Sequence, residues 1–148
     1  MQAAEVQYGR IFLLRLEEGD PLPTCIEDFA RKHQIKNGFV HFMGGLYKGH
    51  VVVGPHSTRP NLPQPVKIPV HEAHESLAFG IISSNGEGDP ILHIHGSLGR
   101  LGQTVTGCLR PGIDTWLVGE VILQEIITEK AYRIPDELSG FTLLKITE

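Results

Sequence analysis

Two histidines separated by one residue stand in the middle of a strand-like segment, His93-Ile94-His95. Residues i and i+2 of a strand point to the same face. The two imidazoles therefore face the same way, about 6.6 Å apart along the strand. At this spacing both can reach one metal ion, because zinc–nitrogen bonds are about 2.0–2.1 Å long. The pair is a candidate metal-binding element.

A predicted hairpin brings a cysteine to these histidines. A two-residue turn at Leu101-Gly102 would pair Arg100 with Gln103, and glycine supplies the positive φ that such turns often need. Counting back along the hairpin places Cys108 opposite His95, about 4.5–5.5 Å away. Two imidazoles and a thiolate with an open fourth position are typical of a catalytic zinc site. The same pattern also fits a polar strand face with a small cysteine as filler.

The two faces of this hairpin differ in polarity. One face carries His93, His95, Ser97, Thr104, Thr106 and Cys108, and the other carries Leu92, Ile94, Leu98, Val105 and Leu109. The apolar face is expected to pack in a core, and the polar face to present the site.

The rest of the chain predicts the elements that must hold this hairpin. A chain of 148 residues with 41% hydrophobic and 20% charged residues predicts one folded domain, residues 1–148, and excludes a disordered chain. The 17 glycines and 10 prolines indicate many turns. Apolar residues three and four apart predict one helix from Leu22 to about Gln34, with Asp20 as its N-cap. The predicted fold class is α+β, a compact, mostly antiparallel sheet with one main helix.

Alternating apolar positions and turn residues divide the remaining chain into strands and loops. Strands are expected at 6–16, 39–53, 75–84, 91–98, 103–110, 116–128 and 141–146, with a bulge or hairpin at Gly44-Gly45. The proline-rich segment 54–69 is predicted to be a loop, and 134–140 a turn or short helix.

The charge and cysteine content narrow the class of protein. Thirteen basic against 17 acidic residues give a net charge of −4, which argues against tight nucleic-acid binding through charge alone. Two cysteines do not make a disulfide framework. No segment reads as a signal peptide or a membrane helix. A cytoplasmic protein without membrane contact is the expectation.

The hairpin and its flanking segments resemble the plant-and-prokaryote conserved (PPC) domain family, in its stand-alone prokaryotic form. The resemblance covers about residues 8–128. It rests on His93-Ile94-His95-Gly96-Ser97-Leu98, the return segment 102–109, Gly9-Arg10, the entry to the helix from Leu16 to Ala30, Phe39 to Gly45, Glu75 to Gly80, and Gly119-Glu120-Val121.

The resemblance implies a fold, an assembly and a metal site. It implies a homotrimer of α+β domains, similar in fold to the zinc enzyme acetolactate decarboxylase, with His93 and His95 as ligands of zinc or another divalent transition metal. The third position in the family is usually histidine, whereas this chain has Cys108 there. A thiolate also binds zinc, but it changes the charge and the redox sensitivity of the site.

Two functions follow as hypotheses, beside a third interpretation, a structural trimer whose site is vestigial. The first is a DNA-binding or regulatory homotrimeric module with a His93, His95 and Cys108 metal site, as members of the family are labelled. The chain lacks an AT-hook, and no DNA-contacting residues are predicted. The alternative is a metal-dependent lyase or hydrolase acting on a small anionic metabolite. Glu75 and Glu120 are then the candidate catalytic groups, and Arg10 or Arg110 could hold a carboxylate.

Three further features of the sequence have simpler interpretations. His71 and His74 are three residues apart before a strand, which excludes the metalloprotease motif with histidines four apart on a helix. His41 alternates with apolar neighbours and is predicted to be a core histidine in preference to a residue of the site. Cys25 lies on the predicted helix and is expected to serve packing.

Overall fold

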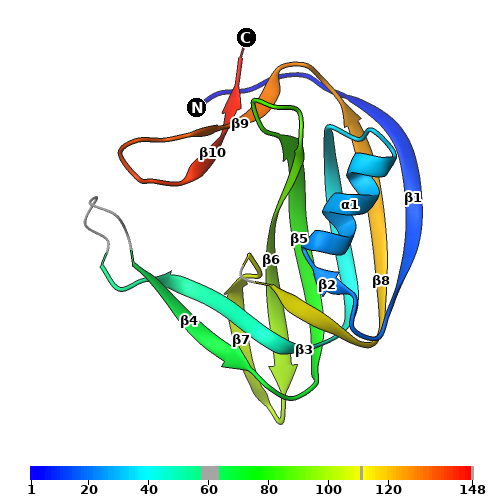
Figure 1. Ribbon diagram of the computed structural model, residues 1–148, viewed down its shortest axis with the longest axis vertical. Helices are drawn as coiled ribbons and strands as arrows, with labels where there is room; N and C mark the ends of the chain where they lie inside the picture. Colours follow the sequence, from blue (N-terminus) through cyan, green and yellow to red (C-terminus); the bar gives the residue numbers. More distant parts are fainter. Residues whose placement is uncertain (58–63, 111, 148) are drawn as a thin grey trace.

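One helix and ten strands make up the described part of the chain (Figure 1). The computed structural model describes residues 1–57, 64–110 and 112–147. The elements are β1 (Gln7–Glu17), β2 (Pro21–Leu22), α1 (Thr24–Lys32), β3 (Asn37–Pro55), β4 (Pro65–Val70), β5 (His74–Ser84), β6 (Pro90–Arg100), β7 (Gln103–Cys108), β8 (Ile113–Ile127), β9 (Ala131–Pro135) and β10 (Thr142–Ile146).

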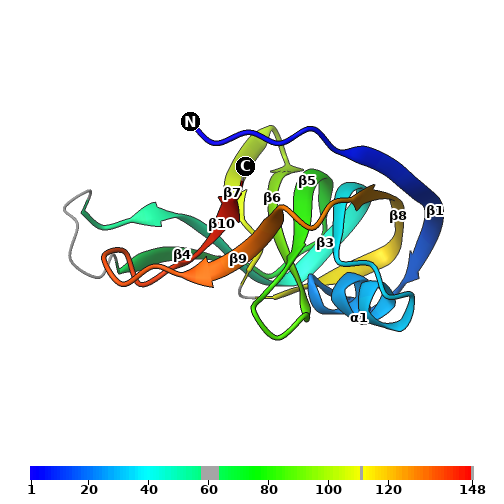
Figure 2. The ribbon, with the colours of Figure 1, turned by 90° about the horizontal axis from the view of Figure 1, so that it is seen from above.

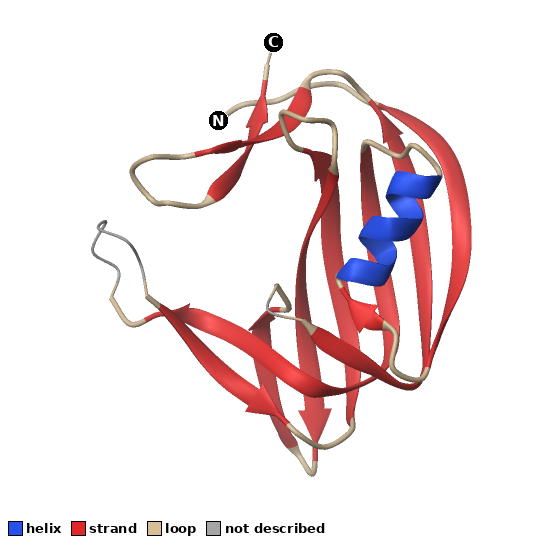
Figure 3. Ribbon diagram, viewed as in Figure 1, coloured by secondary structure: helices blue, strands red, loops and turns tan. Residues whose placement is uncertain are grey.

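Eight of these strands form one curved antiparallel sheet. Its order is β1-β8-β3-β5-β6-β7, with β2 added to β8 and β4 added to β3. The 19-residue β3 is long enough to reach β7 as well, through the pair Val52 and Cys108. Strands β3, β5, β6 and β7 therefore close into a ring. The prediction of a mostly antiparallel sheet with one main helix is confirmed (Figure 3).

The core lies between the helix and one face of the sheet (Figure 2). Ile26 and Ala30, four residues apart on α1, are fully buried. They belong to one apolar cluster with Val40, Phe42, Ile82, Ile94, Leu98, Val121 and Leu123 from the central strands. Burying each large aliphatic side chain stabilises the fold by roughly 1.5–3 kcal/mol. Glu27 also ties the helix to β6, because its Oε1 accepts the backbone N–H of Leu92 at 2.8 Å.

The β6–β7 hairpin has the predicted turn and register. Leu101 and Gly102 both have positive φ, 51° and 75°, as a type I′ turn requires. The pairing runs from Arg100 and Gln103 to His95 and Cys108. Leu92, Ile94 and Leu98 point into the core, which leaves the odd-numbered residues of β6 on the outer face. The predicted pairing of His95 with Cys108 is confirmed.

A glycine permits the close approach of β3 to the end of β7. A Cβ atom at Gly107 would lie 2.2 Å from the carbonyl oxygen of Val52, a distance that real Cβ contacts do not reach. The absence of a side chain at Gly107 thus lets β3 pair with Cys108 and close the ring of strands.

Several predicted boundaries were wrong at the ends of elements. The helix begins at Thr24 rather than Leu22, because Leu22 pairs with β8 as part of β2. Asp20 is not its N-cap; its Oδ2 accepts the backbone N–H of Glu17 at 2.8 Å instead. Pro23 occupies the cap without a side-chain hydrogen bond.

Two predicted loops were also partly wrong. The second half of segment 54–69 forms β4 against β3, because its prolines occupy an edge strand, where a missing N–H is tolerated. Residues 58–63 of that segment lie outside the described residues. Segment 134–140 is neither wholly a turn nor a helix, since β9 extends through Pro135 before the turn to β10. Gly44-Gly45 does form the expected bulge against β8.

The β9–β10 hairpin is a separate two-stranded sheet that contacts β5. The two chain ends lie near each other beside it (Figures 1 and 2). There the backbone N–H of Ile146 donates to Oε1 of Gln2 at 3.0 Å. Within the described ranges, no helix has the length and apolarity needed to cross a membrane.

Candidate metal centre

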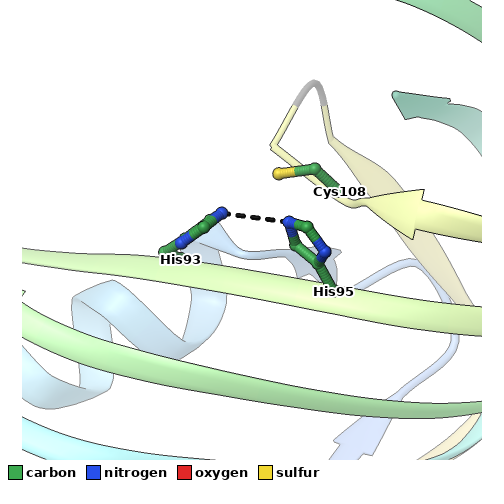
Figure 4. A group of neighbouring side chains, drawn as sticks. All are labelled: His93, His95 and Cys108. Carbon is green, nitrogen blue, oxygen red and sulfur yellow. Dashed lines mark hydrogen bonds between the residues drawn. The ribbon is translucent and has the colours of Figure 1, made fainter. Parts of the chain in front are cut away.

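Three potential metal ligands converge at the junction of β6 and β7 (Figure 4). The ligand atoms of His93, His95 and Cys108 all lie within 4.8 Å of one another. The Nε2 atoms of the two histidines share a hydrogen bond of 3.0 Å, and their ring planes are nearly perpendicular, at 87°. Figure 4 shows the two rings and the sulfur turned toward a common point.

The backbone register fixes where each ligand lies. His93 and His95 project from the same face of β6, where their neighbours on β5 are Ile81 and Phe79. Cys108 is the last residue of β7 and is buried, with 7% of its surface exposed. The pleat of β6 alone determines where the two histidines point. The position of Cys108 also depends on the contact between β3 and β7.

The electrostatics of the cluster favour neutral imidazole at His93. Partial burial, followed by the charges of His95, Arg133 and Arg110, lowers the pKa of His93 to about 4. A neutral imidazole is the form that binds a metal ion. Burial, together with the charge of Asp20, raises the pKa of the Cys25 thiol to about 11. Cys25 is a free cysteine packed beside the core, in agreement with its predicted packing role.

The donor set and its spacing fit a tetrahedral transition-metal ion. Two nitrogens bound to such an ion at 2.0–2.1 Å lie about 3.3 Å apart, and a nitrogen and a sulfur about 3.6 Å apart. The observed 3.0 Å between the Nε2 atoms is within a few tenths of an ångström of this value. The widest separation of the three ligand atoms is up to 4.8 Å, so binding of an ion would require side-chain rotation to shorten it. Imidazole and thiolate together suit zinc and similar divalent ions.

An open pocket of about 560 Å³ adjoins the two histidines. It is lined by Tyr8, Phe39, Val40, His41, Phe79, Gly80, Ile81, His93, His95 and Gln124. Aromatic and aliphatic side chains dominate, with a few polar groups, as is usual for small-molecule sites.

The fold and this geometry can be compared with known proteins. The family described as the Plants and Prokaryotes Conserved domain, abbreviated PCC or PPC, matches residues 3–127. The chain belongs to this family. The predicted family is confirmed.

Solved structures agree with this assignment. A PPC protein from Pyrococcus horikoshii is 27% identical, with a TM-score of 0.85 over 100% of this chain and 99% of that one. A metal-containing protein from Archaeoglobus fulgidus is 26% identical, with a TM-score of 0.83 over 100% of both chains. A protein from Bacteroides thetaiotaomicron called a putative DNA-binding protein is 16% identical, with a TM-score of 0.79 over 95% of this chain and 97% of that one, and shares the fold. Comparison with curated proteins gives no match.

In this PPC domain, the two candidate catalytic carboxylates lie outside the ligand cluster. Glu75 is exposed at the start of β5, opposite Gly99, and lines a second depression that includes Arg100. Glu120 is exposed on β8, opposite Arg15 of β1. Neither residue lines the pocket beside His93 and His95.

His41 is not the core residue that its alternation with apolar neighbours predicted. Phe42 takes the core position on β3, so that His41 is exposed on the opposite face. Its ring stacks edge-on against Phe79 with 4.9 Å between centroids. Both residues line the pocket. The strand period alone does not reveal which of two alternating sets faces the core when both include large apolar residues.

The two arginines considered as carboxylate-binding groups have different surroundings. Arg10 is paired with Glu125 of the same PPC domain, with Nε 2.8 Å from Oε2. Arg110 follows β7 and influences His93 electrostatically. Sequence reasoning missed a third arginine, Arg133, which is buried on β9. The signal that could have revealed it is an arginine within the otherwise apolar run of Ala131-Tyr132-Arg133-Ile134.

Proposed function

We propose that this PPC protein is a homotrimeric metal-binding module in which His93, His95 and Cys108 hold zinc or another divalent transition metal. The observation that carries the proposal is the convergence of two imidazole nitrogens and one thiol within 4.8 Å. The Archaeoglobus fulgidus protein, which is metal-containing, supports it by analogy. The departure from a third histidine to Cys108 keeps a ligand that suits zinc.

Such a site would leave one position on the metal without a protein ligand. A metal with three protein ligands can polarise a carbonyl group or activate a water molecule. The chain's own residues would hold the ion and provide an apolar surface beside it. His41 stands in the same pocket.

The experiment is metal analysis of the purified protein. Protein made without a metal-affinity tag should contain up to one equivalent per chain, and a chelator should remove it. His95→Ala should abolish retention, because His95 lies between His93 on its own strand and Cys108 across the hairpin. His50→Ala, an exposed histidine on β3, is the matched control and should retain the wild-type metal content. Metal-free wild-type protein, with no uptake on addition of zinc, would contradict the proposal.

The proposed trimer is supported by a broad exposed apolar face. Leu13, Met43, Leu77, Phe79 and Ile122 lie on the side of the sheet away from the helix and are exposed. A contiguous group of exposed apolar side chains is typical of an interface. The proposed partners are two further copies of the chain. Light scattering should give three times the 16.3 kDa of one chain. A monomer mass at every concentration would contradict it.

We also propose that any contact of this protein with DNA is indirect. Four cationic side chains, Arg10, Arg15, Arg31 and Lys36, are already paired with carboxylates. DNA affinity rises with the number of phosphates that free lysines and arginines can neutralise. No gel shift is expected with micromolar protein at moderate salt, and a salt-dependent shift on duplex DNA would overturn this view. If the contact with DNA is indirect, the module acts in regulation through protein partners.

The pocket favours a second candidate function, that of a metal-dependent lyase or hydrolase for a small anionic metabolite. The specific observation is an aromatic pocket of about 560 Å³ directly beside the potential ligands. The test is turnover of small oxo- and hydroxy-acids by metal-loaded protein compared with His95→Ala. Equal rates for the two proteins would exclude a metal-dependent activity on these compounds.

A further inference from the structure

The pocket beside the ligand cluster is lined mainly by side chains that carry rings. Six of its ten lining residues are aromatic or imidazole residues, namely Tyr8, Phe39, His41, Phe79, His93 and His95. None of the ten is an aspartate, a glutamate, a lysine or an arginine. A ligand in this pocket therefore meets flat, polarisable surfaces and finds no carboxylate, ammonium or guanidinium group among the described lining residues.

The strand register arranges the lining side chains in two neighbouring rows on the outer face of the sheet. Each row crosses β3, β5 and β6: Phe39, Ile81 and His93 form the first row, and His41, Phe79 and His95 form the second. Adjacent strands lie about 4.8 Å apart, so each row spans about 10 Å. The two rows together form a floor that is wide enough for a flat molecule of two fused six-membered rings.

The phenyl rings of this floor are accessible to a ligand. Phe39 is 38% exposed and Phe79 is 66% exposed. The ring of Phe79 meets that of His41 edge-on, with 4.9 Å between the centroids and 70° between the planes. Apolar rings in water gain free energy when another apolar surface covers them, and aromatic pairs in edge-on or offset geometry gain more than area alone. A ligand ring against Phe39 and Phe79 would therefore extend a ring cluster that already exists.

Two polar side chains of the pocket, those of Tyr8 and Gln124, are available for hydrogen bonds to a ligand. Within the described ranges, neither side chain makes a hydrogen bond to the rest of the chain. A phenol hydroxyl and an amide can each donate and accept a hydrogen bond. They match a ligand hydroxyl group better than a carboxylate, because a carboxylate would lose its hydration without gaining a cationic partner.

We propose that this pocket binds a neutral aromatic molecule of about two fused rings, which packs against Phe39 and Phe79 and forms a hydrogen bond through a hydroxyl group with Tyr8 or Gln124. The inference rests on the proposed function for the use of the pocket as a ligand site, and it adds the chemical class of the ligand. This class differs from the small anionic metabolite of the second candidate function, because the lining residues supply no ammonium or guanidinium group.

Phe79 belongs both to this pocket and to the apolar face proposed as the trimer interface. The ligand would therefore bind where the pocket and that face meet. For this reason the binding experiments use the full chain in the assembly that it forms in solution. An assembly that buried the pocket completely would prevent binding and would overturn the inference.

The first arm of the test is calorimetric titration of the purified protein with 2-naphthol and with decahydro-2-naphthol, its saturated counterpart. Both probes are neutral and carry the same hydroxyl group, so they differ in the aromatic character of the rings. 2-Naphthol should bind about twofold to tenfold more tightly, because ring pairs add attraction beyond the buried area. Absence of 2-naphthol binding would overturn the ligand site. An affinity for the saturated alcohol that equals or exceeds that for 2-naphthol would overturn the aromatic ligand class.

The second arm identifies the rings that contact the ligand. Phe79→Leu should weaken 2-naphthol binding by about twofold to tenfold and change the affinity for decahydro-2-naphthol less, because leucine keeps an apolar side chain. Phe39→Leu should act in the same way, and it serves if Phe79→Leu alters the assembly. Phe141→Leu is the matched control, since Phe141 is 37% exposed and lies outside the pocket, and it should bind like the wild type. Wild-type affinity for 2-naphthol in both Phe79→Leu and Phe39→Leu would overturn the assignment.

The third arm tests the charge of the ligand. It compares 2-naphthol with 2-naphthoate on chelator-treated protein, because a bound metal ion would itself attract a carboxylate. 2-Naphthoate should bind at least about fivefold more weakly, since its carboxylate leaves water without an ionic partner. Tighter binding of 2-naphthoate than of 2-naphthol would overturn the neutral ligand class and favour the anionic metabolite.

Metal uptake separates this inference from the proposed metal site. Phe79→Leu should keep the metal content of the wild type while it loses affinity for 2-naphthol. Binding of 2-naphthol by protein that takes up no zinc would support the aromatic pocket and contradict only the metal site. Retained zinc without 2-naphthol binding would overturn the aromatic pocket and leave the metal site supported.

Discussion

Cys108 lies directly opposite His95 across the β6–β7 hairpin, and the same residue pairs with Val52 of β3 on its other side. The thiol therefore stands where the ring of strands closes. Its position depends on two strand contacts at once, whereas His93 and His95 need only the pleat of β6.

Substitutions of Cys108 should separate its ligand role from its packing role. Cys108→Ser should lose most of the bound metal, because a hydroxyl group is a poor zinc ligand at neutral pH. Cys108→His should retain metal, since imidazole is an equivalent donor. Metal content per folded chain is the measurement, with circular dichroism as the folding control. Full metal content in Cys108→Ala would show that the thiol is not a ligand.

Gly107→Ala should disturb the closure of the sheet beside the cysteine. The added Cβ would lie 2.2 Å from the Val52 carbonyl oxygen, so β3 and β7 must move apart. We expect a loss of about 1–3 kcal/mol in the free energy of unfolding, together with weaker metal retention. Gly99→Ala in the same hairpin is the matched control, because the nearest atom to its Cβ would be 3.8 Å away. Equal unfolding free energies for the two variants would contradict the role of Gly107.

Leu101→Asn should stabilise the hairpin turn. Leu101 has a φ of 51° with 90% of its side chain exposed, so it bears the steric cost of a left-handed conformation without the benefit of burial. Asparagine adopts this conformation more readily and is preferred before glycine in type I′ turns. Urea unfolding should show a gain of about 0.5–1 kcal/mol, whereas the β-branched Leu101→Val should show a loss. A gain in stability in both variants would contradict the explanation from backbone conformation.

The stability of the metal-free protein should fall as the pH is lowered from 6.5 toward 4. Burial, with the charges of His95, Arg133 and Arg110, lowers the pKa of His93 from 6.5 to about 4. Between these values the unfolded chain binds a proton at His93 and the folded chain does not, so acid favours unfolding.

Urea unfolding of chelator-treated protein at pH 7 and pH 5 measures this effect. Other groups also titrate in this range, so His93→Gln is the comparison. The variant should lose less stability than the wild type between the two pH values. An identical loss in both proteins would contradict the lowered pKa.

The spacing of residues determined the hairpin by itself. Leu101-Gly102 specifies a tight turn, and the period of two along each strand then dictates that His95 faces Cys108. The apolar residues Leu92, Ile94 and Leu98 fix which face enters the core, because a shift by one residue would expose all of them. These are local rules, which is why the convergence of the three candidate ligands could be predicted from the sequence.

Only the tertiary structure decided what surrounds that cluster. His41 was predicted to be in the core, but the pairing of β3 with both β5 and β8 turns it outward. Arg133, whose Nη2 donates to the carbonyl of Ile81 on β5, lies on a hairpin separated from His93 by 40 positions in the chain. Contacts of this kind depend on how distant elements pack, and no local period or turn signal encodes them. The sequence alone therefore determined the candidate metal ligands, whereas the packing of β9 against β5 decided which charges stand beside them.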